Sequence, residues 1–316
     1  MSNPATSFEP YRRRLLGLAY RMLASMADAE DAVQDAYLRW HAADRDNVSD
    51  PRAFLMTTTT RICLDMLTSA RARHEEYVGP WLPEPVVDTA ALAPDSRTEL
   101  AEDLSIALLL TLDRLSPLER AAFLLHDVFD FSFTEVASAL ERNEAACRQL
   151  AARARAHVRE ARPRGATAPP VRSGEIDAKH AQLLSAFAAA TQSGDLNALT
   201  QLLASDVRVV TDGGGKVRAA LEVIDGADRA ARFLVEVTRK RPGAWWRDEF
   251  TVRFATINGL PGVIVDAPGG PVQTATFEIE GDVIRALYVV RNPDKLRHLA
   301  PAPHEDVFKR RQEGAL

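Results

Sequence analysis

Residues 132–160 read SFTEVASALERNEAACRQLAARARAHVRE, and this stretch decides the fold of the N-terminal half of the chain. Ser132 with Glu135 three residues later is typical of a capping box, which predicts the start of a helix. Residues 141–143 predict a tight turn. A second helix follows, with apolar residues at helical spacing on its inner face: Cys147, Leu150, Ala151, Ala154 and Val158. Two short helices, a tight turn and a polar outer face predict a helix-turn-helix.

The second helix of this motif carries an excess of positive charge. Seven arginines and two acids lie between residues 142 and 164, a local balance of +5 (7 − 2) in a chain with a formal net charge of −5. Near the start of such a helix, Arg and Gln can hydrogen-bond base edges in a major groove, and later arginines suit phosphates. The alternative is a solvated basic face on a packed helical pair. The candidate DNA-binding residues are Asn143, Arg148, Gln149, Arg153 and Arg155.

Upstream, residues 8–75 carry the patterns of three helices. The first is expected over 8–26, and Asp28 is the expected N-cap of the second. The second has one apolar face that repeats at i, i+3, i+4 and i+7 over 33–40. The third begins at Pro51, because proline fits the first helical position. Its arginines give it a basic side that suits single-stranded DNA.

Two proline-rich segments divide the chain. Residues 76–96 contain four prolines and Trp81, and residues 163–174 form a second linker. Each proline fixes φ and disfavours a helix before it, which predicts an extended, stiff segment. Since a free linker seldom contains tryptophan, we expect residues 76–96 to dock on another part of the protein.

Residues 175–316 change to a mixed pattern of helices and strands. Helices are expected over 175–193, 195–204 and 225–240, and strands over 206–212, 248–258, 262–267, 272–280 and 283–291. This alternation predicts an α+β domain with an antiparallel sheet and helices on one of its faces.

The composition excludes several other classes of protein. The pI of the chain is near 5.9, whereas a protein that binds duplex DNA alone is usually more basic. DNA binding is therefore confined to a local basic surface or depends on a partner protein. Cys63 and Cys147 lack metal-site spacing and are expected to be buried, reduced thiols. The sequence shows no signal peptide and no apolar run of about 18 residues. We therefore expect a cytoplasmic protein with no membrane contact, no metal and no cofactor.

The order of segments resembles that of extracytoplasmic-function (group IV) sigma factors of RNA polymerase. DAEDAVQDAYLRWHAA (28–43) is similar to the helix of sigma region 2 that clamps the polymerase β′ subunit. DPRAFLMTTTTRICLDMLTSARAR (50–73) resembles the part of region 2 that melts and reads the minus-ten element. LSPLERAAFLLHDVFDFSFTEVASALERNEAACRQLAARARAHVRE (115–160) resembles region 4, which reads the minus-thirty-five element.

The resemblance implies two all-α sigma domains, a region 2 helical bundle over 1–75 and a region 4 helix-turn-helix over 97–162. It implies binding to core RNA polymerase, through β′ and β, and to promoter DNA, which is duplex at minus thirty-five and melted at minus ten. The candidate polymerase-docking residues are Asp35, Tyr37, Leu38 and Trp40, of which the two aromatic residues could equally be core. The candidate minus-ten residues are Asp46 and Asn47, for a flipped base, with Arg52 and Arg61.

The remainder resembles a subgroup of these factors with a fused SnoaL-like domain, a cone-shaped α+β fold, here over 175–316. Three motifs carry this resemblance: YVGPWLPEP (77–85), DGGG (212–215) and NPDKL (292–296). The resemblance implies control of the sigma domains in cis, without a separate anti-sigma protein. The candidate interdomain regulatory residues are Trp81, Leu82, Pro83, Glu84, Asp212, Gly213, Gly214, Gly215, Asn292, Pro293, Asp294, Lys295 and Leu296.

Two other classes of function stay open at this point. One is a ligand-responsive helix-turn-helix regulator that acts without polymerase. The other is a DNA-tethered SnoaL-like enzyme, in which Asp212, Asp266 and His180 would be the candidate acid–base groups. Trp245 and Trp246 could line a cavity for an unknown small ligand or simply fill it. Because no spacing marks these acids and the histidine as a pair, we predict that the chain is not an enzyme and has no catalytic residue.

Overall fold

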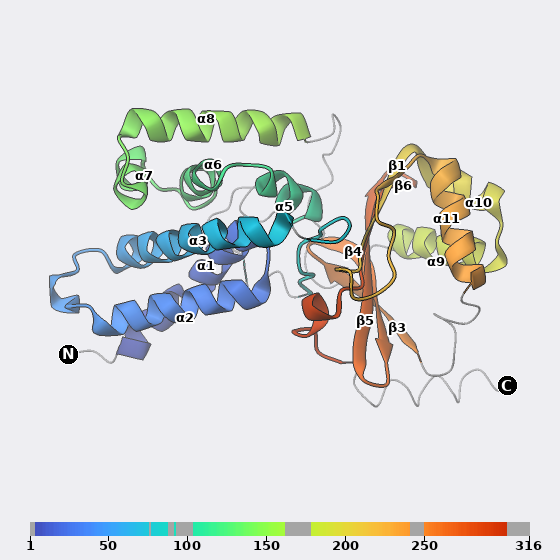
Figure 1. The fold of residues 1–316 in the computed structure, drawn as a ribbon, viewed down its shortest axis with the longest axis horizontal. Helices are drawn as coiled ribbons and strands as arrows, with labels where there is room; N and C mark the ends of the chain where they lie inside the picture. The colour runs from blue at the N-terminus through green and yellow to red at the C-terminus, as the bar shows by residue number, and fades with distance from the viewer. Residues whose placement is uncertain are drawn as a thin grey trace. The chain divides into compact units, whose positions relative to one another are not determined.

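The computed structural model describes residues 4–75, 77–87, 92, 104–161, 178–240 and 250–301, and the chain divides into two compact units (Figure 1). The N-terminal unit contains residues 1–76 and 88–170, and the C-terminal unit contains residues 77–87 and 171–316. The segment 77–87, called the docked linker below, therefore belongs to the C-terminal unit. Trp245 and Trp246 lie outside the described residues.

The first part of the N-terminal unit is a bundle of three helices. These are α1 (Pro4–Leu23), α2 (Met26–Ala42) and α3 (Pro51–Glu75), with the short 3-10 helix η1 (Arg45–Asn47) before α3. All three helices contact one another. Their shared core is apolar and fully buried, with Leu18, Tyr20 and Leu55 at 0% exposure. The start of α3 at Pro51 confirms the sequence prediction.

The boundary between the first two helices differs from the prediction. Helix α1 ends at Leu23 rather than at Met26, because Ala24 takes a left-handed conformation with φ of 53°. The N-cap of α2 is Ser25, whose hydroxyl accepts a 3.1 Å hydrogen bond from the Asp28 amide. Asp28 therefore lies in the first turn, and the prediction that it caps the helix was wrong.

The second part of the N-terminal unit is also helical. It contains α5 (Ile106–Asp113), α6 (Pro117–Phe123), the π-helical turn η3 (Leu124–Val128), α7 (Phe133–Leu140) and α8 (Glu144–Ala161). The predicted capping box of Ser132 and Glu135 is present at the start of α7. A left-handed Glu141 ends α7, and α8 follows after two residues. Helices α7 and α8 form the predicted helix-turn-helix, and α7 also contacts α3.

The C-terminal unit is a six-stranded sheet with helices α9 (Ala178–Ser193), α10 (Leu196–Leu202) and α11 (Ala227–Lys240) on one face (Figure 1). The strand order is β2-β1-β6-β5-β4-β3. Their bounds are β1 (Leu203–Asp212), β2 (Ile224–Asp225), β3 (Thr251–Ile257), β4 (Leu260–Ala267), β5 (Gly270–Glu280) and β6 (Val283–Val290). The 3-10 helix η4 (Pro293–Leu296) follows. The predicted α+β class is confirmed.

One strand pair departs from the predicted antiparallel sheet. Strands β1 and β6 pair in parallel, with Val210 opposite Tyr288 and Asp212 opposite Val290, whereas the other pairs are antiparallel. Parallel pairing needs a long crossover, and in the described residues the whole of α11 and four strands lie between the partners. Hairpin signals in the sequence describe neighbours along the chain, so they do not reveal this pairing.

The two faces of the sheet differ in chemistry. The face toward the helices is covered by apolar side chains, and the rings of Phe187 and Phe277 lie 5.4 Å apart there. The alternate positions of the strands carry buried polar side chains, among them Asp212 and Thr274 at 0% exposure and Thr276 at 1%. Because buried polar groups need hydrogen-bonding partners, this second face needs something polar to cover it.

Cys63 and Cys147 are buried thiols, as predicted. Within the described residues, no helix combines the length and the apolar character that crossing a membrane requires. The same residues hold no cluster of three or more His, Cys, Asp or Glu side chains suited to a metal ion.

Candidate functional site

Asp212, at the end of β1, is the centre of the contact between the docked linker and the sheet. Its carboxylate accepts hydrogen bonds from the Tyr77 hydroxyl and, at 2.9 Å, from the Leu82 amide. The Lys295 ammonium from η4 lies 2.7 Å from the same carboxylate and donates to the Leu82 carbonyl. Asp212 and Lys295 are 0% and 8% exposed at their side chains. One buried ion pair thus joins three segments that are distant in sequence.

The aromatic residues of the linker surround this ion pair. The Lys295 ammonium lies 4.3 Å from the centre of the Trp81 ring and 4.9 Å from that of Tyr77, both cation–π distances. Burial, followed by the hydrogen bond to Asp212, raises the pKa of Tyr77 well above its usual range. The Tyr77 hydroxyl therefore stays protonated and acts as a donor. It was not among the predicted site residues, although it opens the quoted linker motif.

The glycines of the DGGG turn allow close approach to the linker. Gly214 has φ of +58°, and a Cβ there would lie 2.2 Å from the side-chain nitrogen of Asn292. Gly215 has φ of +69° and lies against the Val78 side chain, and a Cβ on Gly213 would meet the Val217 carbonyl at 2.3 Å. Only glycine combines positive φ with so little space.

The NPDKL segment is tied to the same turn. The amides of Arg291 and Asn292 donate to the Asp212 carbonyl at 2.7 and 3.0 Å, and the Asn292 side chain donates to the Tyr77 hydroxyl at 2.9 Å. Asp294 is paired with Lys216, whose hydrogen bond lowers the pKa of Asp294. Pro293 is exposed and Leu296 is buried.

The rest of the docked linker is held by a second set of bonds. The backbone of Val86 exchanges hydrogen bonds with Asn258, at 2.7 Å to the Asn258 amide and 3.1 Å to its side chain. His298 lies 2.7 Å from the Pro85 carbonyl and 3.8 Å from the Glu84 carboxylate. Sequence reasoning missed Asn258 and His298. The pair Asn258-Gly259 does signal a hairpin turn, but not the role of the Asn258 side chain. Leu82, Pro83, Glu84 and Val86 are all buried.

These contacts decide what the carboxylate can do chemically. Asp212 accepts from a hydroxyl, an amide and an ammonium, so it anchors the linker. Asp266 is engaged separately by the Arg253 guanidinium at 2.7 Å, and His180 lies in α9 on the helical side of the cone. The structure does not bring the three candidate acid–base groups together.

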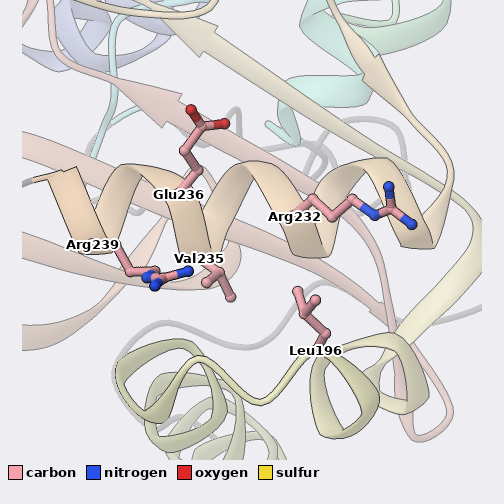
Figure 2. Close-up of a pocket in the computed structure, with 5 residues that line it drawn as sticks. All are labelled: Leu196, Arg232, Val235, Glu236 and Arg239. Carbon is pink, nitrogen blue, oxygen red and sulfur yellow. The ribbon is translucent and has the colours of Figure 1, made fainter.

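A shallow hollow of about 400 Å³ lies between α10 and α11 and is lined by Leu196, Arg232, Val235, Glu236 and Arg239 (Figure 2). Leu196 and Val235 face each other across it, and the charged side chains are exposed. The sequence left open a small ligand for this domain. Among the described residues, this hollow is lined by two apolar side chains, two arginines and one glutamate.

The helix-turn-helix presents its candidate DNA-binding residues on the outer face of α8. Asn143 is the N-cap, accepting a 2.8 Å hydrogen bond from the Ala146 amide. Arg148, Gln149 and Arg153 are exposed, and Arg155 is half-buried. The inner face is buried at Cys147, Ala151, Ala154 and Val158, whereas Leu150 is only half-buried.

Three of these arginines are bonded to carboxylates of the same unit. Arg148 pairs with Glu144, Arg153 with Glu119 and Arg155 with Asp127, each at 2.6 Å. Although burial alone would raise the pKa of Glu119, hydrogen bonds from Arg153 and Ser116 lower it below its usual value. Sequence reasoning identified the arginines but not these acidic partners. Glu144 lies one helical turn before Arg148 on α8, whereas Glu119 of α6 and Asp127 of η3 reach α8 only through packing.

The candidate minus-ten residues fall into two groups. Asp46 and Asn47 are exposed in η1, where the Asn47 side chain donates to Asp44 at 2.7 Å. Arg52 and Arg61, on α3, instead donate to backbone carbonyls of the second helical part of the unit. These arginines are therefore engaged within the chain.

The candidate docking residues on α2 also divide. Asp35 is exposed and Leu38 is 55% exposed, which is high for a leucine. Trp40 is 2% exposed and donates to the Ser7 hydroxyl at 3.1 Å, so it is a core residue. Tyr37 is half-buried against Phe8, with the rings 5.2 Å apart. The aromatic residues support the surface that Asp35 and Leu38 present.

Comparison with known proteins identifies relatives over nearly the whole chain. Family models described as Sigma-70 region 2 and Sigma-70, region 4 match residues 8–73 and 105–158. The chain is 40% identical over 296 residues to the ECF RNA polymerase sigma factor SigJ of Mycobacterium tuberculosis, covering 92% of each. It is 29% identical to the probable ECF RNA polymerase sigma factor SigI of that organism, over 92% of this chain and 94% of the relative. The crystal structure of M. tuberculosis SigJ matches with a TM-score of 0.68 and 34% identity, covering 92% of this chain and 97% of that one.

Proposed function

The chain belongs to the family of extracytoplasmic-function RNA polymerase sigma factors, and from this premise we propose that its C-terminal domain controls the sigma domains in cis through the docked linker. As a sigma factor it directs RNA polymerase to promoters. Region 2 corresponds to α1–α3 and region 4 to α5–α8. The control by the C-terminal domain takes the place of a separate anti-sigma protein.

The sigma domains would use the surfaces described above. Asp35 and Leu38 on α2 dock on the polymerase, since both side chains are exposed on the helix that resembles the polymerase-clamping helix of region 2. Asp46 and Asn47 take a flipped base of the minus-ten element. The outer face of α8 enters the major groove at minus thirty-five, with Arg148 and Gln149 toward the bases.

The observation that carries the regulatory proposal is the buried junction of Asp212, Lys295, Tyr77 and Leu82. The segment between α3 and α5 covers residues 76–105, or 30 residues, which could extend over about 100 Å at about 3.4 Å each. While residues 77–87 are docked, only the 18 residues from 88 to 105 can extend, over about 60 Å. The C-terminal domain thus limits how far regions 2 and 4 can separate when they read two promoter elements.

In-vitro transcription with core polymerase tests this proposal. Trp81→Ala removes the ring that covers Lys295, and it is compared in the full chain and in a chain that ends at residue 165. We expect the substitution to change promoter-dependent transcription in the full chain but not in the truncated one, where the linker has nothing to dock on. Equal effects in both chains, or none in either, would count against the proposal.

Leu38→Ala is the matched comparison. Leu38 lies in α2, so its loss should weaken polymerase docking equally in the full and truncated chains. An effect of Leu38→Ala confined to the full chain would contradict the assignment of α2 as the docking surface. Failure of both chains to co-elute with core polymerase would contradict the function as a whole.

A further inference from the structure

The arginines on the outer face of α8 pair with acids that lie behind them. Glu119 of α6, Asp127 of η3 and Glu144 of α8, called the paired acids below, each bind one guanidinium at 2.6 Å. The side chains of Glu119 and Asp127 are 12% and 16% exposed, whereas that of Arg153 is 56% exposed. A molecule that approaches α8 from solvent therefore meets the arginine before it meets the acid.

The atoms used in these pairs leave part of each guanidinium for another ligand. Arg153 and Arg155 donate to their acids from Nε, and Arg148 donates from one terminal nitrogen. Because a guanidinium carries five N–H donors in a fixed fork, a bond through Nε leaves both terminal nitrogens outside that bond. Two neighbouring donors are what a bidentate contact to guanine requires. An arginine can thus keep its acid while it reads a base.

Arg148 is held by a longer chain of contacts. Its partner Glu144 also accepts a 2.7 Å hydrogen bond from the Thr134 hydroxyl of α7, and the bonds from Thr134 and Arg148 lower the pKa of Glu144. The guanidinium carbon lies 5.2 Å from the centre of the Phe133 ring, a cation–π distance. The rings of Phe133 and His126 are stacked with their centres 4.0 Å apart. These contacts fix the direction of a side chain that otherwise has many rotamers.

The other two acids are also held in place. Among the residues that the structure describes, the second oxygen of Asp127, Oδ2, is buried and has no hydrogen-bond partner. Since a buried carboxylate that loses its cation is strongly destabilising, the pair of Asp127 with Arg155 should persist when DNA approaches. Glu119 closes the capping box of α6 with Ser116, which keeps its carboxylate under Arg153.

Such ion pairs change how α8 responds to DNA of any sequence. Sequence-independent binding comes from phosphates, whose counterions are released when cations of the protein replace them. An arginine already paired with a carboxylate offers less net charge to a phosphate, but its terminal donors stay available. The outer face of α8 therefore loses attraction to phosphates and keeps its means of distinguishing bases.

We propose that the paired acids are positioning residues that make region 4 selective: they weaken its binding to phosphates of any sequence and fix the arginines of α8 for base contact at minus thirty-five. This inference rests on the proposed function, since it takes α8 as the surface that reads that element. The acids and their arginines all lie in region 4, so this selectivity belongs to region 4 and is separate from the docked linker.

Two charge-matched variants of the full chain test the inference. In each variant three acids become their amides, so the net charge changes equally, and circular dichroism should show unchanged helical content. Glutamine keeps the capping box of α6. The amide variant changes the paired acids: Glu119→Gln, Asp127→Asn and Glu144→Gln. The control variant changes three exposed acids outside the pairs: Glu9→Gln, Asp130→Asn and Glu160→Gln.

Binding to heparin, a polyanion without a base sequence, measures the electrostatic part of the inference. We expect the amide variant to elute from immobilised heparin at a higher salt concentration than the control variant, because its three arginines are no longer paired. Equal elution of the two variants would overturn the proposal that the paired acids weaken sequence-independent binding.

Binding of polymerase holoenzyme to DNA with a randomised minus-thirty-five region measures selectivity. Sequencing of the bound DNA gives the preferred element, and titrations compare it with a scrambled one. On scrambled DNA, the slope of log Kobs against log salt concentration should steepen by about 0.9 for each arginine that the amide variant releases. The preference for the selected element should fall about tenfold, the size of one base contact. The control variant should keep the preference of the unsubstituted chain.

Two single substitutions keep the test decisive if the triple variant unfolds. Glu144→Gln, at the partly exposed start of α8, should lose preference at the base pair that Arg148 contacts. Arg148→Lys keeps the charge and removes the fork, so it should lose preference at the same base pair without a steeper salt slope. Losses at different base pairs, or none for Glu144→Gln, would overturn the inference.

The outcomes separate this inference from the proposed function. If the unsubstituted chain does not bind polymerase, or enriches no minus-thirty-five sequence, the proposed function fails and the selectivity inferred here fails with it. If the unsubstituted chain enriches a sequence and the amide variant keeps the same preference and salt slope, the proposed function stands and this inference alone is wrong.

Discussion

At the scale of single residues, the junction between linker and sheet depends on a charge that is removed from water. Asp212 has 0% exposure, and its stability in that place comes from one ammonium, one hydroxyl and one amide. A buried ion pair contributes little net stability compared with apolar residues, but the loss of one partner leaves an uncompensated charge. The pair therefore acts mainly as a specific connector, which fixes where the linker docks.

This reasoning predicts the effect of Lys295→Met. The substitution leaves Asp212 buried without its cation and should lower the free energy of unfolding of the C-terminal unit by about 3–5 kcal/mol. Combining it with Asp212→Asn removes the charge and keeps an acceptor for the Leu82 amide, so the double variant should be more stable than Lys295→Met alone. Urea unfolding of the full chains measures both. A loss below about 1 kcal/mol for Lys295→Met would contradict the connector role.

Glycine substitutions at two turns test the close approach. Gly214→Ala adds a Cβ 2.2 Å from the Asn292 side chain in a left-handed backbone, whereas Gly259→Ala meets nothing within 4 Å at a similar φ of +74°. We expect about 1–2 kcal/mol of destabilisation from the backbone alone at Gly259, and at least about 1–3 kcal/mol more at Gly214. Thermal or urea unfolding of the two variants gives the comparison. Equal losses would show that the turn can move away from Asn292.

At the scale of elements, the sequence predicted those features that depend on local chemistry. The capping box of Ser132 and Pro51 predicted helix starts, and the apolar repeat predicted the inner face of α8 except at the half-buried Leu150. The predicted N-cap of α2 was wrong, because two nearby residues could cap the helix and the local sequence does not distinguish them. Ser25 and Asp28 are both good N-caps, and the left-handed Ala24 selects Ser25.

The same limit applies to the candidate sites. Charge and spacing identified the arginines of α8 and α3, but their partners lie far away in sequence. Arg155 meets Asp127, and Arg61 meets carbonyls 77 and 78 residues away. Those contacts exist only once η3 is packed against α8 and α3 against α7, so no local pattern could reveal them.

The capping box of α7 predicts a specific weakness in the helix-turn-helix. The Ser132 hydroxyl accepts from the Glu135 amide, and the Glu135 carboxylate accepts a 2.7 Å hydrogen bond from the Ser132 amide. Because α7 has only eight residues, Ser132→Ala should cost about 1 kcal/mol and reduce binding to a minus-thirty-five duplex. Ser138→Ala, in the same helix but away from its start, should change neither quantity. Urea unfolding and a DNA-binding titration with polymerase holoenzyme measure these effects, and equal results for the two serines would contradict the role of the cap.

The bond between α6 and α8 should make stability depend on acidity. The folded-state pKa of Glu119 lies below its ordinary value. Its contribution is therefore complete above the ordinary glutamate pKa and is lost as pH falls through the folded value. Arg153 is exposed, so the contribution should be at most about 1 kcal/mol. Urea unfolding at pH about 6 and about 3.5 should show a smaller acid loss for Arg153→Gln than for the unsubstituted chain. Parallel losses would contradict the assignment.

At the scale of the whole molecule, one segment belongs to a different unit from its neighbours in the sequence. Residues 77–87 lie between regions 2 and 4 in sequence, yet they complete the C-terminal unit, where Leu82 and Val86 are 0% and 6% exposed. Removing the C-terminal domain is consequently not a neutral truncation. It exposes an apolar segment inside the sigma part and lengthens the connection that can extend between the two promoter-reading regions.

This dependence predicts how the linker responds to a protease that cleaves after aromatic residues. In the full chain Tyr77 and Trp81 are held against Lys295 and should be cleaved slowly. In a chain that ends at residue 170 the same bonds lose their covering surface, and cleavage there should be at least about tenfold faster, since it then needs no local opening. Cleavage after Phe129, which belongs to the N-terminal unit in both chains, is the internal control and should not change.

Lys295→Met in the full chain should give an intermediate rate, because the linker then loses its central partner but keeps its bonds to Asn258. Equal rates at Trp81 in the full and shortened chains would mean that the linker does not stay docked in solution, and cis control through it would then have no physical basis.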